Sequence, residues 1–90
     1  MAYRIELSPR AKRDFEKLPK HVRPRIARKI DALSEDPRPN GVEMLTDTDR
    51  LYRVRSGDYR VIYQIRDDVL LVLVVRIGDR KEIYKRISEL

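Results

Sequence analysis

Apolar residues in the first part of the chain repeat first with the period of a strand and then with that of a helix. Residues 2–7 alternate between apolar and polar side chains, which predicts a half-buried strand. Ser8 and Pro9 then mark a helix start. The serine hydroxyl can cap a free amide, and proline at the first position loses no hydrogen bond that the helix needs. Helical spacing continues to Leu18, and Pro19 ends this segment.

A second helix is predicted over residues 22–33. Pro24 is compatible with this helix only if it lies in the first turn, because further inside it would remove a backbone hydrogen bond. The segment EDPRPNG, residues 35–41, ends the helix. One stripe carries the apolar positions, which are Val22, Ile26, Ile30 and Leu33.

The second half of the chain changes to the two-residue period of strands. Residues 51–55 and 59–65 alternate around the dipeptide SG, which predicts a hairpin with a two-residue loop. Residues 69–77 are almost continuously apolar, as in a strand covered on both faces. In residues 79–90 the apolar positions return to helical spacing, so a short C-terminal helix is predicted.

These elements predict a single α+β domain spanning residues 1–90, with the order βααβββα. We expect a four-stranded, mostly antiparallel sheet, with the N-terminal helical hairpin packed on it and a short C-terminal helix. The helical hairpin is expected to return the chain to the end of the sheet that it left. The strand at residues 51–55 would then run antiparallel to the first strand.

The hairpin around SG gathers arginines on one face of the predicted sheet. If Ser56 and Gly57 form the loop, Arg53 lies opposite Arg60, and Arg55 lies opposite an acid, Asp58. Two cations directly opposite each other destabilise a sheet by some tenths of a kcal/mol, and an anion between them would turn that penalty into affinity. The core face of the hairpin would carry Tyr52, Val54, Tyr59 and Val61.

Two further residues are expected to approach this face from the end of the chain. If the next turn is also two residues long, Arg60 lies opposite Val75 and the last strand ends beside the first turn. Arg80 would emerge there, and Tyr84 would lie one turn further on the same helix face. Spacing alone is equally compatible with a solvated sheet face, on which arginine stems cover apolar neighbours, and with an anion-binding site.

The charge balance favours an anionic partner. Lys and Arg number 21 against 15 Asp and Glu, a net charge of +6, which is typical of proteins that bind nucleic acid, an acidic protein or a membrane surface. Simple solubility is the alternative explanation. The absence of cysteine excludes disulfides and thiolate zinc sites. The first residues lack a signal-like apolar segment, and residues 69–75 are too short to span a bilayer, so we expect a soluble cytoplasmic protein.

Two motifs, YRVRSGDYRVIY at residues 52–63 and RIGDRKEIY at residues 76–84, resemble the RelE family of toxin–antitoxin modules, within the RelE/ParE superfamily. The resemblance extends to the first strand, the SPRAKRDFEKLP helix and the DP after the second helix. It implies a toxin that cuts messenger RNA in the ribosomal A site with basic residues and a tyrosine. It also implies a cognate antitoxin that wraps and inactivates the toxin, and contact with operator DNA only through that antitoxin.

The resemblance implies five catalytic residues. Arg53 and Arg55 match the family's basic pair in the second predicted strand, and Arg60 matches the arginine of the third. Arg80 and Tyr84 match the arginine and tyrosine near the C-terminus. The four arginines would also bind RNA.

The chain departs from common family patterns at three places. Asp79 stands where many relatives have histidine, and EMLT at residues 43–46 stands where many have Lys-Leu-x-Gly. The only histidine, His21, lies in the helical hairpin. These departures leave open which residue transfers protons.

The expected chemistry is attack of an RNA 2′-OH on the adjacent phosphorus, for which no metal or other cofactor is required. Arginine suits charge stabilisation but is a poor base, because its pKa exceeds about 12. Tyr84 is therefore the hypothetical general base, and Arg60 stabilises the transition state. Arg80 would grip the phosphate near the leaving oxygen, while Arg53 and Arg55 orient the backbone.

Two other functions remain alternatives. A ParE-like toxin shares the fold and poisons DNA gyrase instead of cutting RNA. A catalytically degenerate toxin would persist only as a binding partner of its antitoxin. The partners expected for the main hypothesis are the antitoxin and a ribosome with mRNA in the A site, without a membrane.

Overall fold

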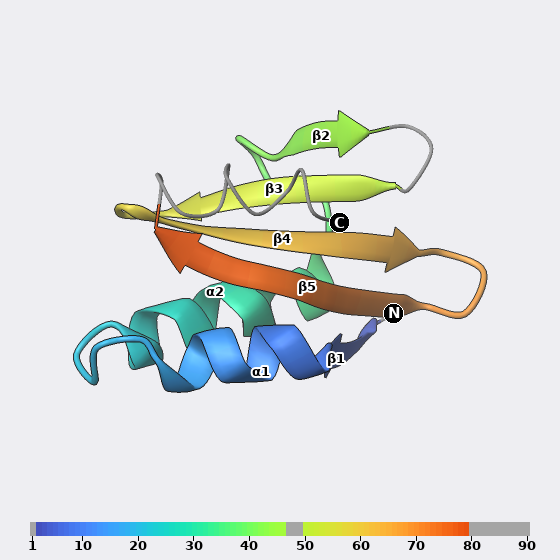
Figure 1. Cartoon of the computed structure of the whole chain (residues 1–90). Helices are drawn as coiled ribbons and strands as arrows, with labels where there is room; N and C mark the ends of the chain where they lie inside the picture. The colour runs from blue at the N-terminus through green and yellow to red at the C-terminus, as the bar shows by residue number, and fades with distance from the viewer. Residues whose placement is uncertain (1, 47–49, 80–90) are drawn as a thin grey trace.

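A computed structural model of the chain describes residues 2–46 and 50–79, which form a five-stranded sheet with two helices on one side (Figure 1). The strand order in the sheet is β1-β5-β4-β3-β2. The predicted α+β class is confirmed, and the predicted C-terminal helix lies outside the described residues. In chain order the elements are β1 (Arg4–Leu7), α1 (Pro9–Glu16), α2 (Arg23–Glu35), β2 (Glu43–Thr46), β3 (Leu51–Ser56), β4 (Tyr59–Arg66) and β5 (Leu71–Asp79).

The strand β2 was not predicted, so the described sheet has five strands rather than four. It pairs antiparallel with β3 at the sheet edge, and its register shifts between Met44 and Thr46. A short edge strand with a shifted register has too few residues for a sustained two-residue alternation. That explains why the pattern of apolar residues did not reveal it.

The predicted direction of β3 relative to β1 is also wrong. β1 runs parallel to β5, which is antiparallel to β4, and β4 is antiparallel to β3, so β3 and β1 point the same way. One reason is the unpredicted strand β2, which is antiparallel to β3 and so adds one reversal of chain direction between α2 and β3. α1 begins directly after β1, where Ser8 N–H donates to the Val74 carbonyl at 2.9 Å. α2 then returns the chain to the start of β1, where Tyr3 N–H donates to the Ser34 carbonyl at 2.7 Å.

The helix start predicted at Ser8 and Pro9 is confirmed, and the second helix meets the condition set by Pro24. The Ser8 hydroxyl accepts a hydrogen bond from Ala11 N–H at 3.0 Å, and Pro9 occupies the first position of α1. Pro24 lies in the first turn of α2, where its missing N–H removes no helical hydrogen bond. Neither described helix is long and apolar enough to cross a membrane.

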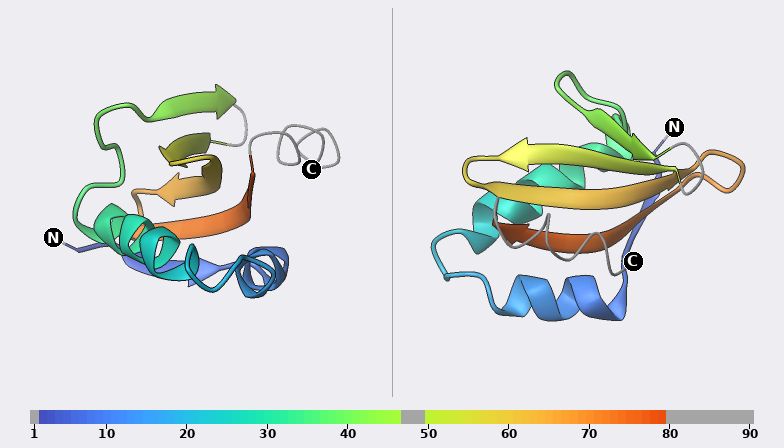
Figure 2. Two further views of the ribbon diagram at one scale, coloured as in Figure 1. Left: turned by 90° about the vertical axis from the view of Figure 1, so that its left-hand side faces the viewer. Right: turned by 45° about the horizontal axis from the view of Figure 1, so that its top comes forward.

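Both helices cover one face of the sheet (Figure 2), and the main core lies between them and that face. The other face carries a smaller apolar cluster around Leu51 and Ile62, with Leu45 and Val75 packed against it. The main core contains, from the helices and their connection, Ala11, Leu18, Val22, Ile26, Ile30 and Leu33, and from the sheet Tyr52, Val54, Val61, Tyr63, Ile65, Val72, Val74 and Ile77.

A buried ion pair closes the edge of β5 beyond the end of β1. Asp14 on α1 accepts from Arg76 Nε at 3.0 Å and from the backbone N–H of Ile77 at 3.0 Å. Arg76 is 2% exposed and Asp14 8% exposed. One carboxylate therefore neutralises a buried guanidinium and also satisfies a backbone donor that would otherwise be unpaired.

A second ion pair holds the β4–β5 turn against the start of the chain. Asp67 accepts from the Tyr3 hydroxyl at 2.6 Å and from Arg38 Nη2 at 2.8 Å. The hydrogen bond from Arg38 lowers the pKa of Asp67 to about 2, and the hydrogen bond to Asp67 raises the pKa of Tyr3. Arg38 also lies over the ring of Tyr52, with Cζ 5.4 Å from the ring centroid. This turn is thus fixed by charge rather than by burial.

Candidate active site

The turn between β3 and β4 determines which arginines face each other. Gly57 has φ +62°, the left-handed conformation that glycine adopts without steric cost at the first central position of a type II′ turn. Ser56 pairs with Tyr59, so the two-residue loop is Gly57-Asp58. The predicted loop, one residue earlier, is wrong, because the residue with positive φ is the first of the loop and not the second.

This register places Arg55 directly opposite Arg60. The predicted pairs of Arg53 with Arg60 and of Arg55 with Asp58 are therefore wrong, and Arg53 lies opposite Ile62. Partners along the strand shift by two residues, and a shift of two preserves the face of every side chain. The three arginines consequently share one face, as predicted, and the conflict between opposite cations persists in a different pair.

The three arginines differ in how tightly the sheet holds them. Arg60 is buried, with 8% exposure, and its Nη1 donates to the Tyr59 carbonyl at 3.3 Å. The side chain of Arg53 is 14% exposed and forms an ion pair with Glu43 on the adjacent strand β2. Arg55 is exposed. The site thus combines two largely buried guanidinium groups with one that solvent reaches freely.

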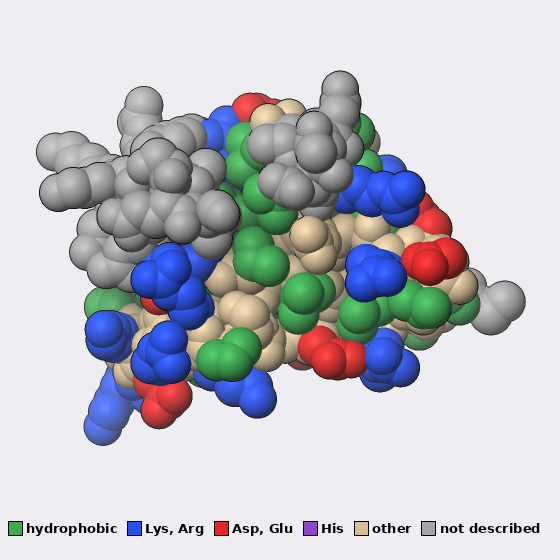
Figure 3. Space-filling view, turned by 45° about the vertical axis from the view of Figure 1, so that its right-hand side comes forward, with side chains coloured by type: hydrophobic (Ala, Val, Ile, Leu, Met, Phe, Trp, Pro, Cys, Tyr) green, Lys and Arg blue, Asp and Glu red, His purple; other side chains and the backbone are tan. Residues whose placement is uncertain are grey.

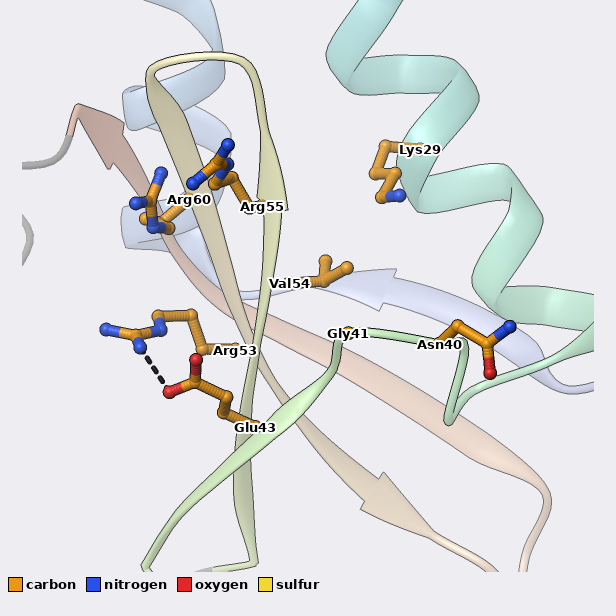
Figure 4. A pocket seen from close by; sticks show the side chains of 8 residues that line it. All are labelled: Lys29, Asn40, Gly41, Glu43, Arg53, Val54, Arg55 and Arg60. Carbon is orange, nitrogen blue, oxygen red and sulfur yellow. Dashed lines mark hydrogen bonds and ion pairs between the residues drawn. The ribbon is translucent and has the colours of Figure 1, made fainter.

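These arginines line one pocket of about 310 Å³ beside the hairpin (Figure 4). In Figure 4 the side chains of Arg55 and Arg60 lie near the turn, on the side of the hairpin away from α2, whereas Lys29 on α2 lies on the other side of β3. Glu43, on the adjacent strand β2, points toward Arg53. The lining residues are Lys29, Asn40, Gly41, Glu43, Arg53, Val54, Arg55 and Arg60.

Lys29, Asn40 and Glu43 were absent from the sequence-based site. Lys29 is one of several basic residues on α2, and no spacing rule distinguishes it from its solvated neighbours. Glu43 became a candidate only through its ion pair with Arg53, which needs the unpredicted strand β2. The departure of EMLT from the family's Lys-Leu-x-Gly was the one sequence signal that pointed to this segment.

The β4–β5 register differs from the prediction. The turn comprises residues 67–70 rather than two residues, and the pairing shifts between Ile62 and Tyr63. Arg60 therefore lies opposite Gly78 and not opposite Val75. A longer turn and a bulge cannot be recognised from apolar alternation, because β5 is apolar at nearly every position.

The end of β5 nevertheless lies where it was predicted, beside the β3–β4 turn. Tyr59 pairs with Asp79, the last residue of β5 (Figure 1). Arg80 follows Asp79 directly in the sequence. Arg80 and Tyr84 lie outside the described residues, so their participation in the site stays a prediction.

The electrostatics of the pocket suit a phosphate. Four cationic side chains and one carboxylate line it, and guanidinium groups bind phosphate oxygens in pairs. Elsewhere, Lys and Arg are spread over the face in Figure 3 with acidic side chains among them. Within residues 2–46 and 50–79, no three His, Cys, Asp or Glu side chains are grouped as metal ligands.

Comparison with known proteins decides the family. Residues 5–84 match the model of the ParE toxin of the type II toxin–antitoxin system parDE. The chain is also 32% identical over 88 residues to the mRNA interferase toxin RelE of Escherichia coli (strain K12), covering 93% of this chain and 92% of that protein. The chain belongs to the RelE family of type II toxins. The family prediction made from the two C-terminal motifs is confirmed.

Solved RelE structures have the same fold. The archaeal RelE–RelB complex from Pyrococcus horikoshii OT3 contains a chain that is 30% identical to this one, with a TM-score of 0.79. The match covers 90% of this chain and 98% of the P. horikoshii chain. The isolated E. coli RelE toxin is 27% identical, with a TM-score of 0.77, covering 98% of this chain and 97% of its own. The arrangement of sheet and helices described above is therefore that of RelE toxins.

Proposed function

We propose that this RelE-family toxin is a ribosome-dependent endoribonuclease that cleaves mRNA in the A site and so inhibits translation. The observation that carries the proposal is the gathering of Arg53, Arg55 and Arg60 on one sheet face beside one pocket. The name of the E. coli relative, an mRNA interferase, supports the same activity. Because the proposed substrate is mRNA on ribosomes, the proposed site of action is the cytoplasm.

The proposed reaction is an in-line transesterification. The 2′ oxygen loses its proton, bonds to the adjacent phosphorus and expels the 5′ oxygen, which takes up a proton. The products are a 2′,3′-cyclic phosphate and a 5′-hydroxyl end. Negative charge on the phosphoryl oxygens increases in the transition state, and preorganised guanidinium groups stabilise that charge.

Arg60 fits the stabilising role because burial and the bond to the Tyr59 carbonyl fix its guanidinium before substrate binds. Arg53 and Arg55 orient the RNA backbone. Tyr84 acts as the general base, since neighbouring cations favour a phenolate, and Arg80 binds the phosphate near the leaving oxygen. None of these steps uses a metal or another cofactor.

The proposed partners are a cognate antitoxin and the ribosome. Solved complexes of RelE with RelB, such as that from P. horikoshii, support an antitoxin partner. Operator DNA would be contacted only through the antitoxin. A role for the ribosome in positioning the RNA fits the described part of the pocket, whose lining within residues 2–46 and 50–79 includes cations but no aromatic side chain on which an RNA base could stack.

A gyrase poison is the second candidate, because the matching family model describes a ParE toxin. Two assays separate the candidates: cleavage of mRNA on translating ribosomes, with 5′ ends mapped, and supercoiling by DNA gyrase. We expect cuts within translated codons and unimpaired supercoiling. Inhibition of gyrase with intact mRNA would replace the proposal by the ParE function.

The site itself is tested by Arg60→Ala and Tyr84→Phe in the mRNA cleavage assay. Removal of a single oxyanion-stabilising donor typically lowers kcat by about 10²–10³, so we expect a loss of that order for Arg60→Ala. Loss of a general base typically lowers the rate by about 10²–10⁴, which we expect for Tyr84→Phe. Arg28→Ala, an exposed cation on α2 outside the pocket, is the control. Unchanged rates for both site variants would contradict the mechanism.

A further inference from the structure

The carboxylate of Glu43 forms an ion pair with the guanidinium of Arg53 within the proposed RNA site. Glu43 and Arg53 are directly opposed residues of β2 and β3, and Arg53 Nη2 donates to Glu43 Oε2. Both residues line the pocket that also contains Arg55 and Arg60 (Figure 4). One of the site's own cations is thus already neutralised by an anion from the same chain.

A carboxylate and a phosphate compete for the same groups of an arginine. Both accept from the paired N–H donors of the guanidinium, so the Arg53 donors engaged by Glu43 are not available to an RNA phosphate. The side chain of Arg53 is only 14% exposed, which restricts the directions from which an anion can reach it. Glu43, which is 63% exposed, can rotate into solvent without losing buried contacts.

We propose that Glu43 is a built-in competitor of phosphate that weakens binding of RNA to the arginine pocket. Substrate must displace its carboxylate to use the Nη2 donor of Arg53 that Glu43 engages. The identity of the ligand as RNA rests on the proposed function, whereas the competition follows from the geometry of the ion pair. The toxin is thereby attenuated by its own second strand.

The alternative role for Glu43 is to hold Arg53 in the orientation that substrate needs. The two roles predict opposite changes in RNA affinity when Glu43 is neutralised. A positioning residue strengthens RNA binding, so its neutralisation would lower affinity, whereas a competitor weakens binding, so its neutralisation raises affinity. The exposure of Glu43 favours competition, because an exposed carboxylate adds little to the orientation of a side chain that the sheet already holds at 14% exposure.

The test measures binding of a short 2′-O-methyl oligouridine, which lacks the attacking 2′-OH, to the full chain by fluorescence anisotropy. For Glu43→Gln we expect affinity to rise by about three- to tenfold, the range of a partly buried ion pair. Glu6→Gln is the matched control. It removes the same charge from another strand arginine–glutamate pair, that of Arg4 and Glu6, at the opposite edge of the sheet. We expect a change of less than about twofold for this control.

A double-mutant comparison identifies the route of the effect. In an Arg53→Gln background, Glu43→Gln should leave affinity unchanged, because the competition acts through Arg53. An equal gain in affinity with and without Arg53 would mean that Glu43→Gln acts only through the net charge of the protein, and it would overturn the proposal. Lower or unchanged affinity in the single variant would also overturn it. Glu43→Ala provides a second exposed substitution if the first impairs folding, as checked by thermal unfolding.

The result is separable from the proposed function. If the wild-type chain leaves ribosomal mRNA intact while Glu43→Gln binds the oligonucleotide more tightly, the endoribonuclease proposal fails and the competition stands. If mRNA is cut and Glu43→Gln changes neither binding nor rate, only the competition fails. If neither form binds the oligonucleotide, there is nothing for Glu43 to compete with, and the inference is wrong.

Discussion

The pairing of Arg55 with Arg60 predicts that the site destabilises the free toxin. We therefore expect Arg55→Gln to raise the stability of the folded chain while weakening its binding to RNA. Directly opposed residues of an antiparallel pair hold their Cβ atoms about 4.5–5.5 Å apart, and Arg60 is largely buried. The buried Arg60 cannot move away, so only the exposed Arg55 can turn its guanidinium toward solvent.

The size of the repulsion follows from Coulomb's law. Two guanidinium groups about 7 Å apart repel by about 0.6 kcal/mol in water at low salt. At physiological ionic strength the Debye length of about 8 Å reduces this by roughly half. For a domain of this size, relief of about 0.5 kcal/mol corresponds to a rise in Tm of about 2–4 °C.

Thermal unfolding at low and high NaCl concentration tests the prediction. At low salt Arg55→Gln should melt above the wild type, and added salt should stabilise the wild type more than the variant. Arg66→Gln is the control, because Arg66 is also exposed on β4 but lies opposite Leu71 and has an acid, Asp68, 4.0 Å away instead of an opposed cation. A lower Tm for Arg55→Gln, or salt dependence equal to that of the wild type, would refute the reasoning.

Two predictions concern the ion pairs that support the fold. Asp14→Ala should lower the free energy of unfolding by about 3–5 kcal/mol in urea titrations, because it leaves the buried Arg76 charge unpaired; a loss below about 1 kcal/mol would contradict the burial of this pair. The pKa of Asp67, lowered from 3.8 to about 2, contributes stability above pH 4 that disappears as the pH falls through 2. Asp67→Asn should therefore cost about 0.5–1 kcal/mol at pH 7, after allowance for exposure, and almost nothing near pH 2; a constant difference across this range would exclude the linkage.

Much of the architecture was predictable from local patterns. The capped start of α1 at Ser8, the position of Pro24 in α2 and the alternation along β3 and β4 each depend on near neighbours in the chain. Alternation also determined that Arg53, Arg55 and Arg60 share a face, since a register error of two residues leaves every face unchanged. The family followed from two motifs that retain this hairpin and the segment after β5.

The tertiary structure decided which charges meet. The loop at Gly57-Asp58 made Arg55 the partner of Arg60, and the unpredicted strand β2 brought Glu43 to Arg53. Asp14 and Arg76 are 62 residues apart in the chain. Sequence periodicity reports the face on which a side chain lies, whereas a partner depends on turn lengths, bulges and strand order. Each turn length and each bulge shifts the register of every pair that follows it. The sequence alone therefore determined a basic sheet face, and the fold decided which acids and cations lie next to each other on it.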